Sequence, residues 1–183
     1  MLGNDLGEGA VLCPLEPYQA AEFAAWTEAN RAHLAPWLPW VHAVTDTASA
    51  RTLLQHYAER EAADEGRIYA IRQDGELVGG TLFRVFDTAQ GSCELGAWLA
   101  PEAQGRGLVT RAAGAMIDWA VDERGMARME WMVSPVNAAS IAVAKRLGMR
   151  HEGTLRSVFE MAGERHDLEM WAVLADEWRA ARG

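Results

Sequence analysis

Short apolar segments and longer segments with helical spacing follow one another along the chain, which favours a mixed α/β fold. Residues 10–15, AVLCPL, are apolar over a short length and predict a first strand. Pro17 stands at a favoured first helical position and opens a predicted helix over residues 17–34. Two prolines in the following APWLPW end this helix. Its spacing predicts an apolar face that carries Tyr18, Ala21, Ala25 and Trp26.

A second helix is predicted over residues 48–66, where Thr45 or Thr47 could cap the start and Gly66 marks the end. The next segment, residues 67–86, holds two apolar runs separated by an Asp-Gly pair. A two-residue hairpin turn needs positive φ values, which this pair tolerates. The segment therefore predicts two antiparallel strands.

The second half of the chain predicts a strand–helix–strand unit and a second helix with clear end signals. Residues 92–99, SCELGAWL, predict a strand, and a glycine-containing loop leads to a helix from about Gly107 to Arg124. RMEWMVS predicts the next strand, and NAASIAVAKRLG a helix with Asn137 as its N-cap and Gly148 as its stop. HDLEMWAVL predicts a late strand before a short closing helix.

This order of elements predicts one mixed, mostly antiparallel central sheet flanked by helices, in a single domain over residues 1–183. The chain is 50% hydrophobic and 23% charged, which is typical of soluble globular proteins. No apolar run reaches membrane-spanning length, and the N-terminus lacks the features of a signal peptide. We therefore expect a cytoplasmic protein that does not bind membranes.

The formal net charge of -9 argues against general nucleic-acid binding, which requires a basic face. It suits a cationic partner such as an amine or a basic protein, or it serves solubility alone. The two cysteines form no disulfide pattern, and the five histidines show no metal-ligand spacing. Neither a disulfide nor a metal is expected.

The stretch APEAQGRGLV, residues 100–109, places Gly105 and Gly107 around Arg106 where a strand becomes a helix. Free backbone N–H groups at a helix N-terminus bind anions, and glycine lets a phosphate approach them closely. A plain tight turn would explain the same glycines. The stretch lacks the Gly-Lys-Ser/Thr of a nucleotide P-loop, and Thr110 stands where a dinucleotide fingerprint has its third glycine.

Two motifs make the sequence resemble the GNAT superfamily of N-acetyltransferases. Gln104, Gly107 and Val109 match motif A, Q/R-x-x-G-x-G/A, with valine in place of the usual glycine or alanine. NAASIAVAKRLGMRHEG resembles motif B in the form N-x-x-S-x-x-x-x-x-x-x-G of the RimJ/RimL branch. NRAHLAPWLPW, ELVGG, ELGAWLAPEAQGRG, EGTLR and a closing EW extend this likeness over residues 11–178. The chain thus resembles the RimJ/RimL-like ribosomal-protein N-terminal acetyltransferases.

The resemblance implies the GNAT fold and acetyl-CoA as co-substrate, without a metal. The pyrophosphate would bind backbone amides of the glycine-containing loop, and the strand GAWL would carry an oxyanion donor at or beside Leu99. Asn137 would serve both as helix cap and as a partner of the CoA arm. The residues expected to bind the cofactor are Leu99, Gln104, Gly105, Arg106, Gly107, Leu108, Val109, Thr110, Asn137 and Ser140.

The resemblance also implies direct transfer of acetyl to a primary amine, which needs an acid and a base. Most members of the superfamily have a tyrosine where this chain has Ala144, whereas the RimL-like branch uses the serine at Ser140 to protonate the thiolate. Glu160 lies near the position of the base in ribosomal-protein acetyltransferases. Glu94 is the competing carboxylate, and either glutamate could instead be structural.

The acceptor that the resemblance favours is the N-terminal α-amine of a protein, such as a ribosomal protein. A small-molecule amine, such as an aminoglycoside or a polyamine, is the alternative acceptor, and a non-catalytic acyl-CoA-binding module is the alternative function. Trp37 and Trp40 could line the acceptor cleft or form a packed corner. Because relatives of this branch often form homodimers, a homodimer is also expected.

Overall fold

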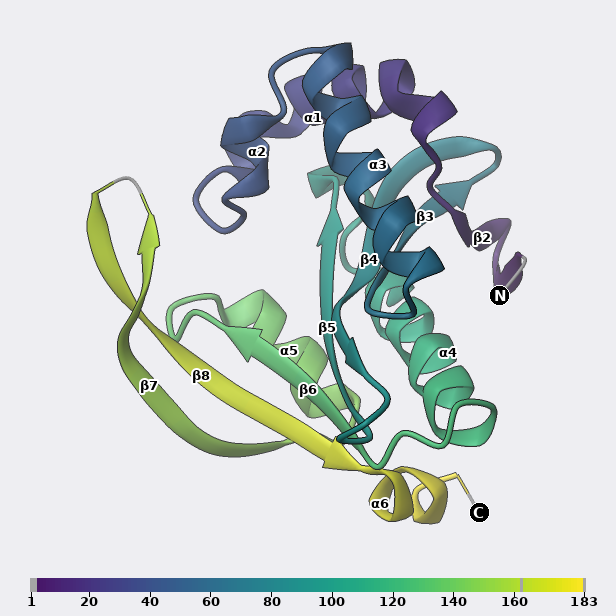
Figure 1. The fold of residues 1–183 in the computed structure, drawn as a ribbon, viewed down its shortest axis with the longest axis vertical. Helices are drawn as coiled ribbons and strands as arrows, with labels where there is room; N and C mark the ends of the chain where they lie inside the picture. The colour runs from purple at the N-terminus through teal and green to yellow at the C-terminus, as the bar shows by residue number, and fades with distance from the viewer. Residues whose placement is uncertain (1–2, 162, 183) are drawn as a thin grey trace.

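Eight strands form one open, mixed sheet in the computed structural model, which describes residues 3–161 and 163–182 (Figure 1). The order across the sheet is β1-β2-β3-β4-β5-β6-β8-β7, and all neighbours are antiparallel except the parallel pair β5 and β6. The predicted mixed, mostly antiparallel sheet is therefore confirmed. The strands are β1 (Asn4–Gly7), β2 (Ala10–Pro14), β3 (Arg67–Gln73), β4 (Glu76–Asp87), β5 (Ser92–Leu99), β6 (Arg128–Val133), β7 (Arg150–Met161) and β8 (Glu164–Leu174).

Helices cover both faces of the sheet, so that each face has its own hydrophobic core. The first three helices pack on one face, and α4 and α5 pack on the other. The last helix, α6, lies beside α4, where the Trp178 indole N–H donates to Asp118 at 2.8 Å. The helices are α1 (Ala20–Leu34), α2 (Trp40–Ala43), α3 (Thr47–Ala62), α4 (Leu108–Asp122), α5 (Ala138–Arg146) and α6 (Ala175–Ala180).

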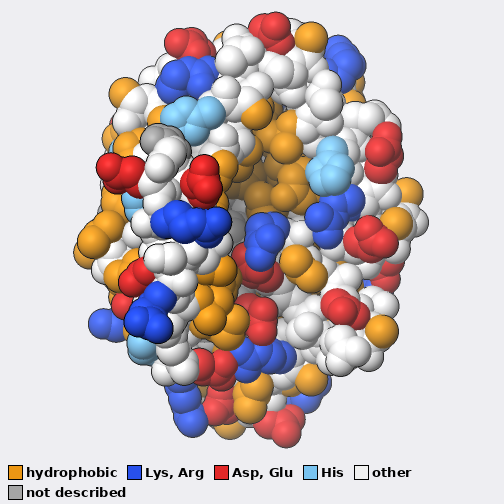
Figure 2. Space-filling view, turned by 60° about the vertical axis from the view of Figure 1, so that its left-hand side comes forward, with side chains coloured by type: hydrophobic (Ala, Val, Ile, Leu, Met, Phe, Trp, Pro, Cys, Tyr) orange, Lys and Arg blue, Asp and Glu red, His pale blue; other side chains and the backbone are white. Residues whose placement is uncertain are grey.

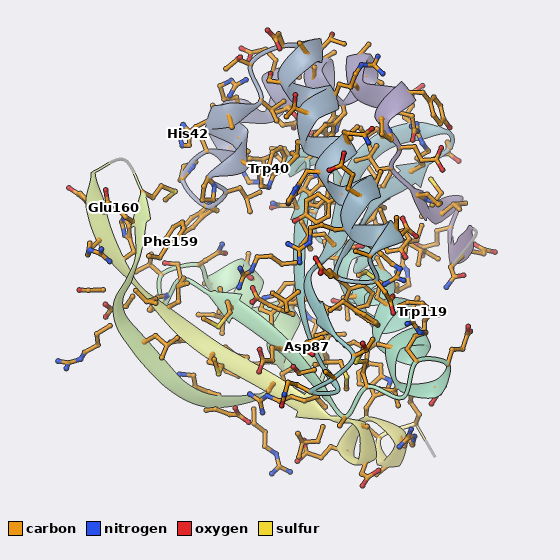
Figure 3. The ribbon with its side chains drawn as sticks, viewed as in Figure 1. Trp40, His42, Asp87, Trp119, Phe159 and Glu160 are labelled. Atoms are coloured by element: carbon orange, nitrogen blue, oxygen red, sulfur yellow. The ribbon has the colours of Figure 1, made fainter. Side chains whose placement is uncertain are left out.

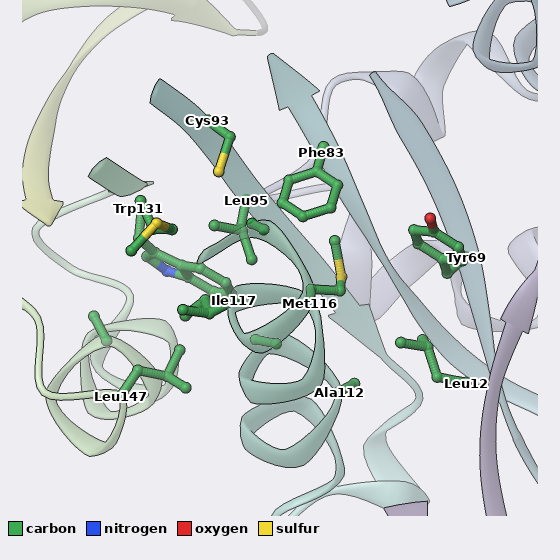
Figure 4. Packing of buried hydrophobic residues seen from close by; sticks show 14 of the residues in the cluster. Leu12, Tyr69, Phe83, Cys93, Leu95, Ala112, Met116, Ile117, Trp131 and Leu147 are labelled. Atoms are coloured by element: carbon green, nitrogen blue, oxygen red, sulfur yellow. The ribbon is translucent and has the colours of Figure 1, made fainter. Parts of the chain in front are cut away.

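The core under α4 is built from a stripe of small and apolar residues at helical spacing. Small side chains let the helix approach the sheet, and larger ones fill the remaining space against β5 and β6 (Figure 4). Leu95 and Trp131, paired across β5 and β6, both belong to this core. The stripe consists of Leu108, Ala112, Ala113, Met116, Ile117, Ala120 and Val121.

The predicted hairpin between β3 and β4 is confirmed, with φ values of 51° at Asp74 and 88° at Gly75. The predicted caps of α3 are wrong, because neither neighbouring threonine caps this helix. Asp46 does so, and its carboxylate accepts the Ser49 N–H at 2.8 Å. The helix also ends at Ala62, earlier than predicted, since Asp64 takes the left-handed conformation (φ 61°) expected of a glycine.

The predicted buried face of α1 is also wrong. Tyr18 lies in the 3-10 turn before the helix and is 73% exposed, whereas the inward face includes two polar residues. Thr27 donates its hydroxyl to the Phe23 carbonyl at 2.7 Å, and Asn30 donates to the Trp26 carbonyl at 2.9 Å. These bonds satisfy the buried polar groups within the helix, so an apolar pattern alone missed this face.

Two strands at the edges of the sheet escaped prediction. The β1 strand is four residues long and pairs with β2 through an irregular register. The longer β7 pairs with β8 and has mostly exposed side chains, so it lacks the apolar alternation of a half-buried strand. Its register shifts twice, and Ser157 has a φ of 52° beside the second shift.

We predict that Gly80→Ala destabilises the fold much more than Gly96→Ala on the neighbouring strand. A Cβ at Gly80 would lie 2.2 Å from the Trp98 ring and 2.4 Å from the Tyr69 carbonyl oxygen. A Cβ at Gly96 would meet only Leu82, at 3.4 Å, which is an ordinary contact. Overpacking costs about 1–3 kcal/mol in free energy of unfolding, which urea denaturation would measure. Equal midpoints for the two variants would contradict this account.

Candidate active site

The sheet opens between its two parallel strands. Residues Ser92–Leu95 of β5 pair with Arg128–Trp131 of β6, while β5 continues to Leu99 along β4 alone. The two strands therefore diverge beyond Leu95, as their ribbons show (Figure 1). The edge of β5 that faces β6 presents backbone N–H and C=O groups toward this opening.

Two helices begin at the open end of the two strands. Because β5 and β6 are parallel, their carboxyl ends point the same way, and each is followed by a helix on the same face of the sheet. The loop of residues 100–107 leads from β5 into α4, and residues 134–137 lead from β6 into α5. The positive ends of both helix dipoles thus lie near the opening.

The predicted glycine-containing loop forms the first of these helix starts. Gly105 and Gly107 have φ values of 78° and 72°, in the left-handed region that favours glycine. Gly107 is the N-cap of α4 and no side chain caps the helix. The first helical bond is donated by the Arg111 N–H to the Gly107 carbonyl, at 3.0 Å, so the three preceding amides have no intrahelical acceptor. These N–H groups are available to an anion.

Residues of this loop differ in how far their side chains are buried. Leu108 is buried in the core under α4, and so anchors the loop, whereas Val109 and Thr110 are half-buried. Gln104 and Arg106 are exposed. Leu99, the other predicted cofactor residue nearby, ends β5 and pairs with Gly79 on β4.

The side chains of Arg111 and His33 also contact the loop, and neither residue was predicted from the sequence. Arg111 donates to the Arg106 carbonyl at 2.8 Å and contacts the Glu8 carboxylate at 3.4 Å. The Gln104 side-chain amide lies 2.9 Å from the His33 Nε2 atom, which joins the loop to α1. A cation in the first turn of a helix after an anion loop could have singled out Arg111. Nothing in the sequence relates His33 to a residue 71 positions away.

The start of α5 carries the predicted pair Asn137 and Ser140. Asn137 is the N-cap, as predicted, and its Oδ1 atom accepts the Ser140 backbone N–H at 3.1 Å. The Ser140 side chain is half-buried, and its Oγ atom accepts the Trp131 indole N–H at 2.9 Å. Ala144, one turn further along, is fully buried.

Glu94 lies on β5 and is only 8% exposed. Both of its carboxylate oxygens accept hydrogen bonds from the Arg84 guanidinium on β4, in a bidentate ion pair. Across the parallel pair, Glu94 stands opposite Glu130, which is itself paired with Arg128 at 2.6 Å. Both oxygens of Glu94 are therefore already engaged within the sheet.

Glu160 lies in a different setting, near the tip of the hairpin formed by β7 and β8. Its side chain is 63% exposed, and its carboxylate is 3.9 Å from the Arg165 guanidinium. Figure 3 shows Glu160 and Phe159 on this arm and His42 and Trp40 on the segment across from it. Figure 2 shows a hollow with mainly hydrophobic walls, and its rim carries His, Lys, Arg and acidic side chains.

The two predicted acceptor residues differ in their packing. Trp40 stacks on Phe23 with a centroid distance of 5.5 Å and meets Trp98 edge-on at 5.5 Å, so it is part of the core beside α1. Trp37 is at the surface. Arg31 holds this segment to α1, since its guanidinium donates to the Val41 and Val44 carbonyls. The segment therefore combines a packed corner with an accessible indole.

A buried cysteine, potential metal ligands and membrane-spanning helices are the remaining features to consider. Burial raises the pKa of the Cys93 thiol to about 12, so this group is a thiol rather than a nucleophilic thiolate at neutral pH. Residues 3–161 and 163–182 contain no group of three His, Cys, Asp or Glu side chains placed to hold a metal ion. Within the same residues, none of the helices has the length and apolar character to cross a membrane.

Known proteins share both the sequence pattern and the fold. The family described as "Acetyltransferase (GNAT) domain" matches residues 11–150. A Bacillus subtilis (strain 168) relative named "Putative ribosomal N-acetyltransferase YdaF" is 28% identical over 173 residues, or 92% of each chain. The solved structure of Mycobacterium smegmatis RimJ in complex with CoA-disulfide is 26% identical with a TM-score of 0.83, and covers 94% of this chain and 89% of that one.

The fold also agrees with that of a protein of lower sequence identity. The structure of RimL, an alpha-N-protein acetyltransferase of a ribosomal protein solved with coenzyme A, has a TM-score of 0.91 at 22% identity. The alignment covers 96% of this chain and 99% of the RimL chain. Because the family match spans most of the sequence and the sheet, helices and opening agree with it, the protein belongs to the GNAT family and is an N-acetyltransferase.

Proposed function

We propose that the opening between β5 and β6 binds acetyl-CoA and that the enzyme transfers its acetyl group directly to a primary amine. The observation that carries this proposal is the start of α4, where two left-handed glycines and three amides without helical acceptors face the open end. Such a group of N–H donors at a helix N-terminus suits a pyrophosphate. The amides of Arg106 to Thr110 would hold it, and Arg106 and Arg111 would add positive charge.

The donor would extend from this loop along the free edge of β5. Its acetyl carbonyl would lie beside the backbone N–H at or next to Leu99, which would stabilise the oxyanion that forms during attack. The Asn137 side chain, at the start of α5, would contact the CoA arm. Gln104, tied to His33, would close the cradle from the side of α1. The two helix starts would therefore hold opposite ends of the same donor.

Ser140 would act as the general acid. Its hydroxyl lies in the first turn of α5, where the positive end of the helix dipole favours a developing negative charge. The departing thiolate would take its proton as the carbon–sulfur bond breaks. Ala144, at the position of the tyrosine used elsewhere in the family, offers no competing donor.

Glu160 would act as the general base, with Glu94 as the alternative. The acceptor amine must lose a proton to attack, and Glu160 lies on the arm beside the hydrophobic hollow. Glu94 is engaged by Arg84 through both oxygens, which favours a structural role for it. We assign the acceptor as the N-terminal α-amine of a protein, such as a ribosomal protein, in line with the names of the relatives. Trp37 and Trp40 would line its path.

We predict that Gly107→Val weakens CoA binding at least about ten-fold, which corresponds to about 1.4 kcal/mol. The side chain would block phosphate approach to the loop amides. Gly125→Val is the matched control, because it has a similar φ of 67° and no atom near its Cβ at the other end of α4. Isothermal titration with CoA would measure both variants. Unchanged affinity in a folded Gly107→Val protein would reduce the loop to a plain turn.

We predict that Ser140→Ala lowers kcat by about 100-fold while KM for acetyl-CoA stays nearly constant, since the proton is donated only in the transition state. Glu160→Gln should remove the acidic limb of the pH–rate profile, because that limb reports protonation of the base. Glu94→Gln should keep the limb. Loss of the limb in the Glu94 variant alone would reverse the assignment, and its persistence in both would exclude both carboxylates.

We predict that peptides with a free N-terminus are acetylated faster than small amines. Thiol release from acetyl-CoA would be followed with ribosomal-protein N-terminal peptides, with polyamines and with aminoglycosides. The matched control is each peptide with its α-amine already acetylated, so that only lysine amines remain. Turnover of small amines alone would replace the proposed acceptor, and the absence of thiol release with any of these amines would favour an acyl-CoA-binding module.

A further inference from the structure

A buried tryptophan contacts the proposed acid directly. Trp131 lies on β6, is 3% exposed and packs in the core under α4 and α5 (Figure 4). Its indole nitrogen lies 2.9 Å from the Ser140 Oγ atom, which joins the diverging strand to the first turn of the next helix. An indole N–H is an expensive group to bury without an acceptor, so this bond fixes the position of the serine side chain.

The direction of this hydrogen bond follows from the chemistry of the two groups. An indole nitrogen can only donate, whereas a serine hydroxyl has one hydrogen and two lone pairs. Trp131 therefore occupies a lone pair of Ser140 and leaves the hydroxyl hydrogen to point elsewhere. No acceptor for that hydrogen is found among the side chains and backbone groups of residues 3–161 and 163–182. The half-buried hydroxyl thus keeps its hydrogen for a donor role.

Two other features complete the environment of this hydroxyl. The Ser140 backbone N–H donates to the Asn137 side chain, while the Ser140 hydroxyl accepts the Trp131 indole N–H. The positive end of the α5 dipole and the indole N–H both favour negative charge on Oγ. Both interactions with the Oγ atom would strengthen as Ser140 begins to lose its proton. The arrangement resembles an oxyanion hole whose ligand is the serine itself.

We propose that Trp131 is a positioning residue for acetyl transfer, which holds the Ser140 hydroxyl toward the leaving sulfur and stabilises the alkoxide that forms there. This inference rests on the proposed acid role of Ser140. As the amine nitrogen forms its bond to the acetyl carbon, it gives up a proton to the proposed base Glu160, the carbon–sulfur bond breaks and its electron pair stays on sulfur. The sulfur takes the Ser140 proton, and the resulting alkoxide, held by the Trp131 N–H, is reprotonated from solvent.

The test removes one indole hydrogen bond at a time. Trp131→Phe keeps an aromatic ring and removes the N–H, and kcat should fall about ten-fold with KM for acetyl-CoA unchanged. Trp178→Phe removes a comparable bond, from its indole to Asp118 at 2.8 Å, at the far end of α4. That control should keep the wild-type kcat. An unchanged kcat in Trp131→Phe would overturn the inference.

A double-mutant cycle separates positioning from packing. If Trp131 acts through Ser140, Trp131→Phe should cost nothing further in kcat when Ser140→Ala is already present. If the fold losses in kcat of the two single variants multiply in the double variant, Trp131 acts by packing alone, and the inference is overturned. A wild-type kcat in Ser140→Ala would instead refute the acid role itself, so the two failures are distinguishable.

A second approach covers the case in which Trp131→Phe does not fold. Site-specific replacement of Trp131 by benzothienylalanine keeps the bicyclic shape and substitutes sulfur for the N–H. The same ten-fold loss in kcat is expected, and full activity would contradict the proposal. Nitrogen-15 NMR of the indole groups gives a further readout. The Trp131 N–H resonance should shift in Ser140→Ala while that of Trp178 stays in place, and an unmoved Trp131 resonance would show that the bond is absent in solution.

Discussion

Four residue pairs between β5 and β6 join the two halves of the sheet, and the position at which this pairing stops determines the rest of the site. β5 stays paired with β4 to Leu99 and β6 stays paired with β8 to Val133, so the two halves of the sheet separate after Leu95 and Trp131. Leu95 and Trp131 form the last of these pairs, and their side chains belong to the core under α4. One further parallel pair would begin to close the opening, because hydrogen bonds across it would bring the strand edges together.

The two helices that start at this opening differ in how their first amides are satisfied, and that difference divides their chemical roles. α4 begins at a glycine and has no side-chain cap, so its first amides are left to solvent or to the proposed donor. α5 begins at Asn137, whose side chain accepts the Ser140 amide, and the serine hydroxyl is engaged by the Trp131 indole N–H instead. A side-chain cap on α4 would compete with the proposed donor for these amides.

The sequence was most informative where local chemistry decides the structure. The Asp-Gly turn, the Asn137 cap and the left-handed glycines before α4 follow from backbone preferences that need no tertiary context. Tertiary context decided the rest. Asn30 lies on the face of α1 that packs inward, where its amide bonds to the Trp26 carbonyl, and β7 is a strand because β8 supplies its partners. The Trp131–Ser140 and Arg84–Glu94 contacts depend on side-chain placement across elements, which periodicity cannot reveal.

The two candidate carboxylates show how burial separates structural from reactive charge. Glu94 is nearly enclosed on the sheet, where an unpaired carboxylate would be costly, so the Arg84 ion pair is a condition of its burial. Glu160 is largely exposed beside Arg165 on a hairpin arm, and water can solvate either of its protonation states. A base that must gain and lose a proton in each cycle is better placed on the arm than on the sheet.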